Sequence, residues 1–166
     1  FTPPPGHFFQ MTQDATDRKF RIREKNGLTY VFEAIAGTPG QTAKLLQLID
    51  RHGNTLTLNY TNGVLTSVTD GLNRSLTFTY TGTRITAVQD WTGRQHQYVY
   101  SAAGDLITYK NPLAVAGSQN PVSYAYYTAA PLAHVMQSYT LPRGNGMTFE
   151  YYANGRVFRH ATTLGE

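Results

Sequence analysis

The chain contains no cysteine and few charged residues. Without cysteine, it can form neither a disulfide framework nor a thiolate metal site. Charged side chains make up 14% of its 166 residues, whereas roughly 25% is usual in a globular domain. No stretch approaches the ~18 consecutive apolar residues that indicate a membrane-spanning helix. The net charge of +4 is mild and mostly reflects the scarcity of acids.

Common catalytic and cofactor motifs are missing as well. There is no Gly-x-Ser-x-Gly nucleophile elbow and no glycine-rich phosphate loop. The histidines have no metal-binding spacing, and a Ser-His-Asp triad cannot be identified from spacing without geometry. We therefore expect no enzyme activity, no catalytic or metal-ligating residue and no cofactor.

What the sequence does have is a period of twenty residues. Tyrosines, aspartates and turn residues each recur at this spacing. The recurring positions are Tyr60, Tyr80 and Tyr100; Asp50, Asp70 and Asp90; and Gly53, Asn73 and Gly93. Such a period is typical of a repeated supersecondary unit. Since one unit cannot bury its apolar face alone, function is to be sought in the array.

One repeat unit encodes two strands. Residues 54–60 alternate polar and apolar side chains, as a half-buried strand does. Asn-Gly at 62–63 is a strong signal for a tight hairpin turn, and residues 64–69 form the returning strand. Leu65 and Val68 are three apart, so we expect a bulge between them.

A second type of turn connects one unit to the next. Each begins with Asp and has Gly or Asn at its fourth position, which favours a type I turn with the carboxylate capping backbone N–H groups. These caps explain Asp50, Asp70 and Asp90 without calcium, which needs six or more oxygen ligands. Gly53 and Gly93 are then explained as the fourth residues of such turns.

The register extends beyond the clear copies. We expect a Pro-rich lead-in and first strand in residues 1–26, six imperfect hairpins in 27–162 with an insert at 112–121, and a tail at 163–166 that continues into further repeats. Asn154-Gly155 is the expected turn of the sixth hairpin. No stretch has helical periodicity. The predicted fold is all-β, an array of antiparallel hairpins forming a curved, twisted sheet strip.

The tyrosine column has two interpretations. The rings can pack along adjacent strands and stabilise the sheet, or they can stack on sugars or on a peptide. We favour the structural interpretation for this column. Its members are Tyr60, Tyr80, Tyr100 and, in the same register, Tyr151. His96 replaces Leu56 and Leu76 in its repeat, so we expect it on the same side of the sheet.

A basic strand is the best sequence argument for an acidic partner. Lys19, Arg21, Arg23 and Lys25 alternate with apolar residues, so their charges share one face. They can meet an anionic surface, form a solvated face or protect an edge strand. We favour the solvated face and expect no nucleic acid partner. These four residues and Tyr124 remain the candidate surface contacts.

The repeat resembles a known family. Residues 70–80 read Asp-Gly-Leu-Asn-Arg-Ser-Leu-Thr-Phe-Thr-Tyr and are followed by Ile85, Val88 and Asp90. This pattern resembles the Rhs or YD repeat, and the opening at residues 2–32 looks like the start of an Rhs shell. The resemblance implies a sheet strip of the kind that encloses a toxic C-terminal domain in bacterial polymorphic toxins, in insecticidal toxin complexes and in the related teneurins.

Two functions follow as expectations. The first is a non-enzymatic segment of a secreted or surface-exposed bacterial shell, used in interbacterial competition, with its own C-terminal toxin cargo, further shell repeats and secretion machinery as partners. The family's self-cleavage motif is not found, since the chain has no Asp-Pro. The alternative is an extracellular module for carbohydrate or receptor binding. An open strip also leaves two sheet edges, so we expect the isolated fragment to curl on itself or to pair through its edges into an oligomer.

Overall fold

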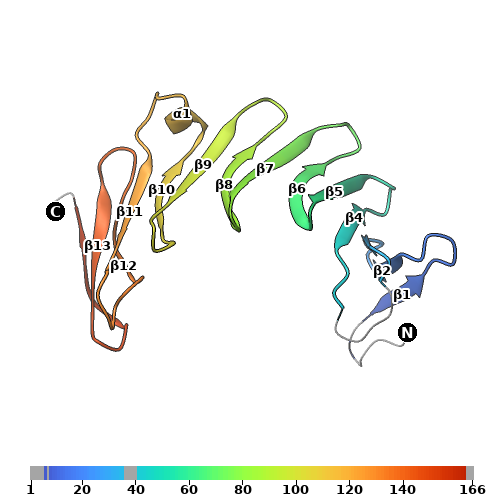
Figure 1. Ribbon diagram of the computed structural model, residues 1–166, viewed down its shortest axis with the longest axis horizontal. Helices are drawn as coiled ribbons and strands as arrows, with labels where there is room; N and C mark the ends of the chain where they lie inside the picture. Colours follow the sequence, from blue (N-terminus) through green and yellow to red (C-terminus); the bar gives the residue numbers. More distant parts are fainter. Residues whose placement is uncertain (1–5, 7, 36–40, 164–166) are drawn as a thin grey trace. The chain divides into compact units, whose positions relative to one another are not determined.

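The computed structural model of the chain describes residue 6 and residues 8–35 and 41–163. The strands form an antiparallel sheet in which each strand pairs with its neighbours along the chain (Figure 1). The predicted all-β class and antiparallel hairpin array are therefore confirmed. The prolines of the lead-in and most of the predicted tail lie outside the described residues. The chain divides into two units, Phe1–Thr77 and Phe78–Glu166, and each is described by itself.

Unit 1 contains the first six strands. They are β1 (Phe9–Gln13), β2 (Phe20–Glu24), β3 (Thr29–Phe32), β4 (Leu45–Ile49), β5 (Thr55–Thr61) and β6 (Val64–Thr69). The sequence predicts a single strand before residue 27, but the structure has the hairpin β1–β2.

Unit 2 contains the later strands, and β7 (Ser75–Thr81) lies across the boundary. The others are β8 (Arg84–Gln89), β9 (Gln95–Tyr100), β10 (Leu106–Lys110), β11 (Val122–Tyr126), β12 (Met136–Thr140), β13 (Gly146–Tyr151) and β14 (Val157–Thr162). Strands β3 to β14 thus form where the repeat predicts hairpins.

The insert between β10 and β11 contains a short helix, α1 (Pro112–Val115), which the sequence analysis missed. The sequence does contain a signal for this helix, because Asn111 is a favoured N-cap residue and Pro112 a favoured first helical residue. The Asn111 side chain accepts a hydrogen bond from the Ala114 N–H at 2.9 Å. No helix among the described residues has the length and apolar character needed to span a bilayer.

The predicted bulge is present. Asn59 lies opposite Ser67, but its neighbour Tyr60 lies opposite Leu65, so Thr66 has no residue opposite it. The Thr66 hydroxyl donates to the Asn59 carbonyl at 3.2 Å. Other hairpins have the same irregularity, with one extra residue in the returning strand. The extra residues are Leu46 in β4, Ile107 in β10, Gln137 in β12 and Phe158 in β14.

Both predicted turn types are found. Asn62 and Gly63 have φ values of 50° and 82°, as the tight hairpin turn between β5 and β6 requires. Asn154-Gly155 differs from the prediction, because only Gly155 has a positive φ, at 80°. Gly155 is the last residue of a turn that begins at Tyr152, and the Tyr152 N–H donates a hydrogen bond to the Arg156 carbonyl at 2.9 Å. The last hairpin therefore closes with the longer turn type.

Alternation gives each unit two chemically different faces. In unit 1, we define the apolar face by Leu48, Leu56, Leu58, Val68 and Leu76, which lie opposite one another across the strands. In unit 2, the apolar face continues through paired residues of β8 to β14. Its members are Val88, His96, Tyr98, Tyr109, Val122, Tyr124, Tyr139, Met147, Phe149 and His160. The opposite, polar face is rich in Thr, Ser, Asn and Gln.

Burial is unusually low. Within the described residues, the buried hydrophobic side chains are Val31, Ala87 and Ala114, at 2%, 8% and 8% exposure. Val31 lies opposite Arg21 and Gln47, on the polar face, while Leu56 and Leu76 of the apolar face are 41% and 42% exposed. The described strands of each unit therefore form one layer, and in unit 2 the short helix α1 packs against β9 and β10.

Gly146 provides a test of the pairing between β12 and β13. A Cβ at this position would meet the Tyr139 carbonyl oxygen and, at 3.0 Å, the Thr140 Cα. We expect Gly146→Ala to lower the free energy of unfolding by about 1–3 kcal/mol, because both groups are backbone that must shift. Gly71→Ala is the matched control, since nothing lies within 4 Å of its Cβ position. Equal urea denaturation midpoints for the two variants would contradict this packing.

Candidate functional site

Successive hairpins are joined by short ladders. Within the hairpin β5–β6, five residue pairs lie opposite one another, from Thr57–Thr69 to Thr61–Val64. Between hairpins, β6 and β7 share three pairs. The connections β4–β5, β8–β9 and β12–β13 also have three pairs each. The Asn-Gly end of a hairpin therefore extends past the ladder that joins it to its neighbour.

Tyrosine hydroxyl groups bridge the gap that these short ladders leave. Tyr60 Oη donates to the Leu45 carbonyl at 2.9 Å, and Tyr100 Oη donates to the Ile85 carbonyl at 3.0 Å. Leu45 and Ile85 both lie beyond the last pair of the adjoining ladder. We call these contacts tyrosine clamps. They explain the tyrosine column, in which Tyr80 occupies the same repeat position.

The connection between the fifth and sixth hairpins uses a different tyrosine. Tyr127, which follows β11, donates its Oη hydrogen to the Phe149 carbonyl at 3.0 Å, one residue past the three-pair ladder between β12 and β13. Tyr151, which has the predicted repeat register, contributes its ring instead. It contacts Tyr127 edge-on at a centroid distance of 6.0 Å and Phe149 at 6.5 Å. Sequence reasoning missed Tyr127 because it lies outside the twenty-residue register.

Aromatic rings gather on the apolar face of unit 2. His96 faces the same side as predicted, since it lies opposite Val88 as Leu76 lies opposite Val68. Its ring is stacked on Tyr109 at 5.8 Å, and its Nδ1 is 2.7 Å from the Tyr109 hydroxyl. Tyr98 contacts Tyr109 at 5.6 Å, and partial burial raises the Tyr98 pKa. The candidate contact Tyr124 belongs to this face, opposite Tyr139.

The aspartate column consists of turn caps. Asp70 Oδ1 accepts backbone hydrogen bonds from Leu72 at 2.9 Å and Arg74 at 3.0 Å, and Oδ2 accepts from Arg74 Nε at 2.7 Å. Asp50 and Asp90 accept backbone hydrogen bonds from the residues two and four positions later in the same way. Among the described residues, no group of three or more His, Asp or Glu side chains is placed to hold a metal ion.

Hydrogen bonds depress the pKa of all three aspartates. A hydrogen bond from the Thr92 hydroxyl, with further bonds from Arg94, lowers the pKa of Asp90 to about 2. The Asn54 side chain has the largest effect on the Asp50 pKa, and the Arg74 backbone N–H on that of Asp70. Since donors to a carboxylate stabilise its charged form, these caps operate in the ionised state.

Two of the four cations of the basic strand, Lys19 and Arg21, are paired with nearby acids. Arg21 pairs with Asp17 at 2.9 Å and with Asp14 at 3.3 Å, and Lys19 lies 3.5 Å from Asp17. The Arg21 hydrogen bond is the main cause of the lowered Asp17 pKa, about 2. The four cations therefore do not form a continuous basic patch.

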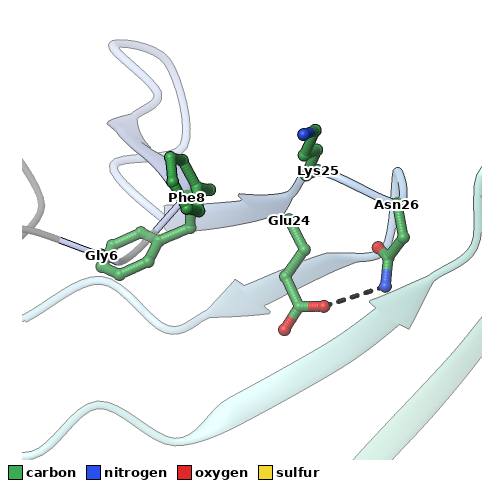
Figure 2. Close-up of a pocket in the computed structure, with 6 residues that line it drawn as sticks. Gly6, Phe8, Glu24, Lys25 and Asn26 are labelled. Carbon is green, nitrogen blue, oxygen red and sulfur yellow. Dashed lines mark hydrogen bonds between the residues drawn. The ribbon is translucent and has the colours of Figure 1, made fainter.

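A shallow cleft of about 550 Å³ lies at the start of the described chain. Figure 2 shows Phe8, Glu24 and Asn26 around it, with Glu24 bonded to Asn26 at 3.1 Å. Glu24 also accepts from the Tyr30 hydroxyl at 3.1 Å, and the Lys25 ammonium lies 5.8 Å from the centre of the Phe8 ring. Both charged residues that line the cleft, Glu24 and Lys25, are thus engaged by neighbouring side chains.

One further contact joins turns that are distant in sequence. His134 Nδ1 lies 2.9 Å from Asp105 Oδ1, and His134 has a positive φ of 67°. The pair joins the β11–β12 loop to the β9–β10 turn, and no short-range signal could have predicted it across 29 residues. Its imidazole is 59% exposed, so the contact is a surface ion pair of modest strength when His134 is protonated.

Comparison with known proteins adds no assignment. No protein-family model matches the chain, and no curated protein matches it. The resemblance to Rhs repeats therefore rests on the residues of the repeat itself.

The tyrosine clamps can be tested by removing one oxygen. We expect Tyr60→Phe and Tyr100→Phe each to lower the free energy of unfolding by about 0.5–1.5 kcal/mol, because each leaves a part-buried carbonyl unpaired. Tyr152→Phe is the matched control, since no hydrogen bond of the Tyr152 hydroxyl is found within the described residues and its side chain is 59% exposed. Urea denaturation measures all three. A Tyr152→Phe effect as large as the others would refute the clamps.

The aspartate caps predict acid sensitivity. Because folding lowers the Asp90 pKa from 3.8 to about 2, its carboxylate stabilises the fold above pH ~4, and this contribution is lost as the pH falls toward 2. Asp90→Asn is expected to have a smaller drop in melting temperature between pH 5 and pH 2.5 than the unchanged chain. A carboxyl ¹³C titration of Asp90 checks the pKa directly, and a midpoint at or above 3.8 would contradict the cap.

Proposed function

We propose that the chain is a structural wall segment of an Rhs-type shell, with no enzymatic activity of its own. In this proposal the polar face meets water, and the apolar face covers an enclosed polypeptide, the toxin or effector domain of a secreted bacterial protein. The sheet acts by separating this cargo from its surroundings and by restraining it.

The uncovered apolar face is the observation that carries the proposal. Antiparallel sheets normally pack one face on a core and expose the other to water. Here Leu56 and Leu76 remain about two-fifths exposed on the face that should be packed, and no second layer of described residues covers it. An apolar face of this kind requires a partner surface.

The connections between strands are suited to a single-layer wall. The clamps and the aspartate caps act between adjacent strands or within one turn. None of them needs a second layer, so hairpins can be added without rearranging those already present, as in other repeat proteins. The wall can therefore extend while its apolar face stays free for cargo.

Electron microscopy of a full-length polypeptide containing this chain tests the proposal. We expect a closed shell that encloses density, because the apolar face then has a covering partner. An open rod without enclosed volume would refute the wall function. In the isolated chain, Leu56→Lys is expected to lower binding of an apolar dye, whereas Leu72→Lys, in an exposed turn, is not.

Glycan recognition is the second candidate. The half-exposed rings of unit 2 favour it, because tyrosine offers an apolar body with a polar tip. The wall proposal expects the isolated chain to bind nothing on a glycan array. Binding that Tyr124→Ala abolishes would favour the second candidate instead.

A further inference from the structure

Asn-Gly pairs occur at residues 26–27, 62–63, 145–146 and 154–155. In such a pair the glycine nitrogen can attack the asparagine side-chain amide, because glycine has no Cβ to hinder the approach. We infer that the fold directs this spontaneous deamidation to Asn62, which is converted to aspartate or isoaspartate while the other three asparagines are protected. The inference concerns a covalent modification site and does not depend on the proposed wall function.

The reaction needs no reactant other than water. The Gly63 nitrogen gives up its proton and bonds to Cγ of Asn62, the bond from Cγ to Nδ2 breaks, and Nδ2 leaves as ammonia. Water then opens the resulting succinimide ring at one of its two carbonyl carbons, which gives aspartate or isoaspartate. In both products a carboxylate replaces a neutral amide, and in isoaspartate the side-chain methylene becomes part of the main chain.

The turn at Asn62-Gly63 reaches the reactive geometry through a single peptide flip. Its two φ values, 50° and 82°, are those of a type I′ turn. Rotation of the peptide plane between the two residues gives a type II′ turn, in which ψ of the first central residue is about −120°. At this angle the Cα–Cβ bond of Asn62 eclipses its C–N bond, as closure of the succinimide ring requires. Both turn types close two-residue hairpins, so β5 and β6 can stay in place.

The flip breaks no hydrogen bond of the described chain. Within the described residues, neither the Asn62 side chain nor the Gly63 N–H has a hydrogen-bond partner, and both residues are exposed. The Lys44 ammonium lies 3.9 Å from the position that a Cβ of Gly63 would occupy. Its positive charge favours the anionic intermediate that forms when the deprotonated nitrogen attacks Cγ. The site is therefore free to react and lies beside a stabilising charge.

Hydrogen bonds protect two of the other asparagines. Oδ1 of Asn26 accepts a hydrogen bond from the Leu28 N–H at 2.8 Å. The nitrogen that would attack it, that of Gly27, donates to the Glu24 carbonyl at 3.0 Å. Asn154 is held in the same way, by the N–H two residues later at 3.2 Å, and the glycine after it donates to a carbonyl at 2.9 Å. Reaction at either site must first break both bonds.

Strand pairing protects the fourth site. Gly146 is buried and lies opposite Thr140 in the ladder between β12 and β13. A Cβ on this glycine would lie 3.0 Å from the Thr140 Cα, so its backbone has little room to turn. A succinimide at Asn145 therefore requires this part of the ladder to open.

Peptide mapping by mass spectrometry measures all four sites in one sample of the folded chain, incubated at mildly alkaline pH. We expect Asn62 to lose its amide about tenfold faster or more than the other three, because they must first break hydrogen bonds. In guanidinium chloride the four rates should become similar, since the sequence pair is the same at each site. Equal rates in the folded chain, or a faster reaction at any other Asn-Gly pair, would overturn the inference.

A variant tests the contribution of the neighbouring charge. Lys44→Gln is expected to slow the reaction at Asn62 by about fivefold, the effect of one charge about 4 Å away in water. Lys25→Gln is the matched control and should leave the Asn62 rate unchanged, and circular dichroism checks that both variants keep their strands. An Asn62 rate that is the same in the two variants would overturn the role of Lys44.

Discussion

The three-pair ladder between hairpins is the constraint on which the rest of the structure depends. The hairpin β5–β6, with five paired positions, is joined to β7 by only three, so part of each of these strands has no backbone partner on one side. Buried or part-buried carbonyl groups without partners are costly. The hydroxyl of Tyr60 donates a hydrogen bond to such a carbonyl, that of Leu45, and the hydroxyl of Tyr100 does the same for the carbonyl of Ile85.

At the other end of the ladder, the aspartate caps accept hydrogen bonds from backbone N–H groups. There the chain must reverse between one hairpin and the next, which leaves backbone N–H groups of the turn to be satisfied. Asp70 accepts two of them, and Arg74 fixes the second carboxylate oxygen. Tyrosine and aspartate thus hold opposite ends of the same short connection. This arrangement explains why both recur with the same period.

A sheet stabilised along its own plane has little need for a core, and its apolar face stays available. That face differs between the units, with leucines such as Leu56 in unit 1 and rings such as Tyr98 and Tyr109 in unit 2.

The sequence by itself determined the local structure: the Asn62-Gly63 turn, the aspartate caps, the bulge between Leu65 and Val68 and the side of the sheet that His96 faces. Each depends on residues close in the chain or on the period-two alternation of a strand. Only the tertiary structure decided the partners of the Tyr60 and Tyr127 hydroxyls, the Asp105–His134 pair and, within the described residues, the lack of a layer over the apolar face. These depend on where ladders end and on which strands lie side by side, and such distances in space are not encoded in local spacing.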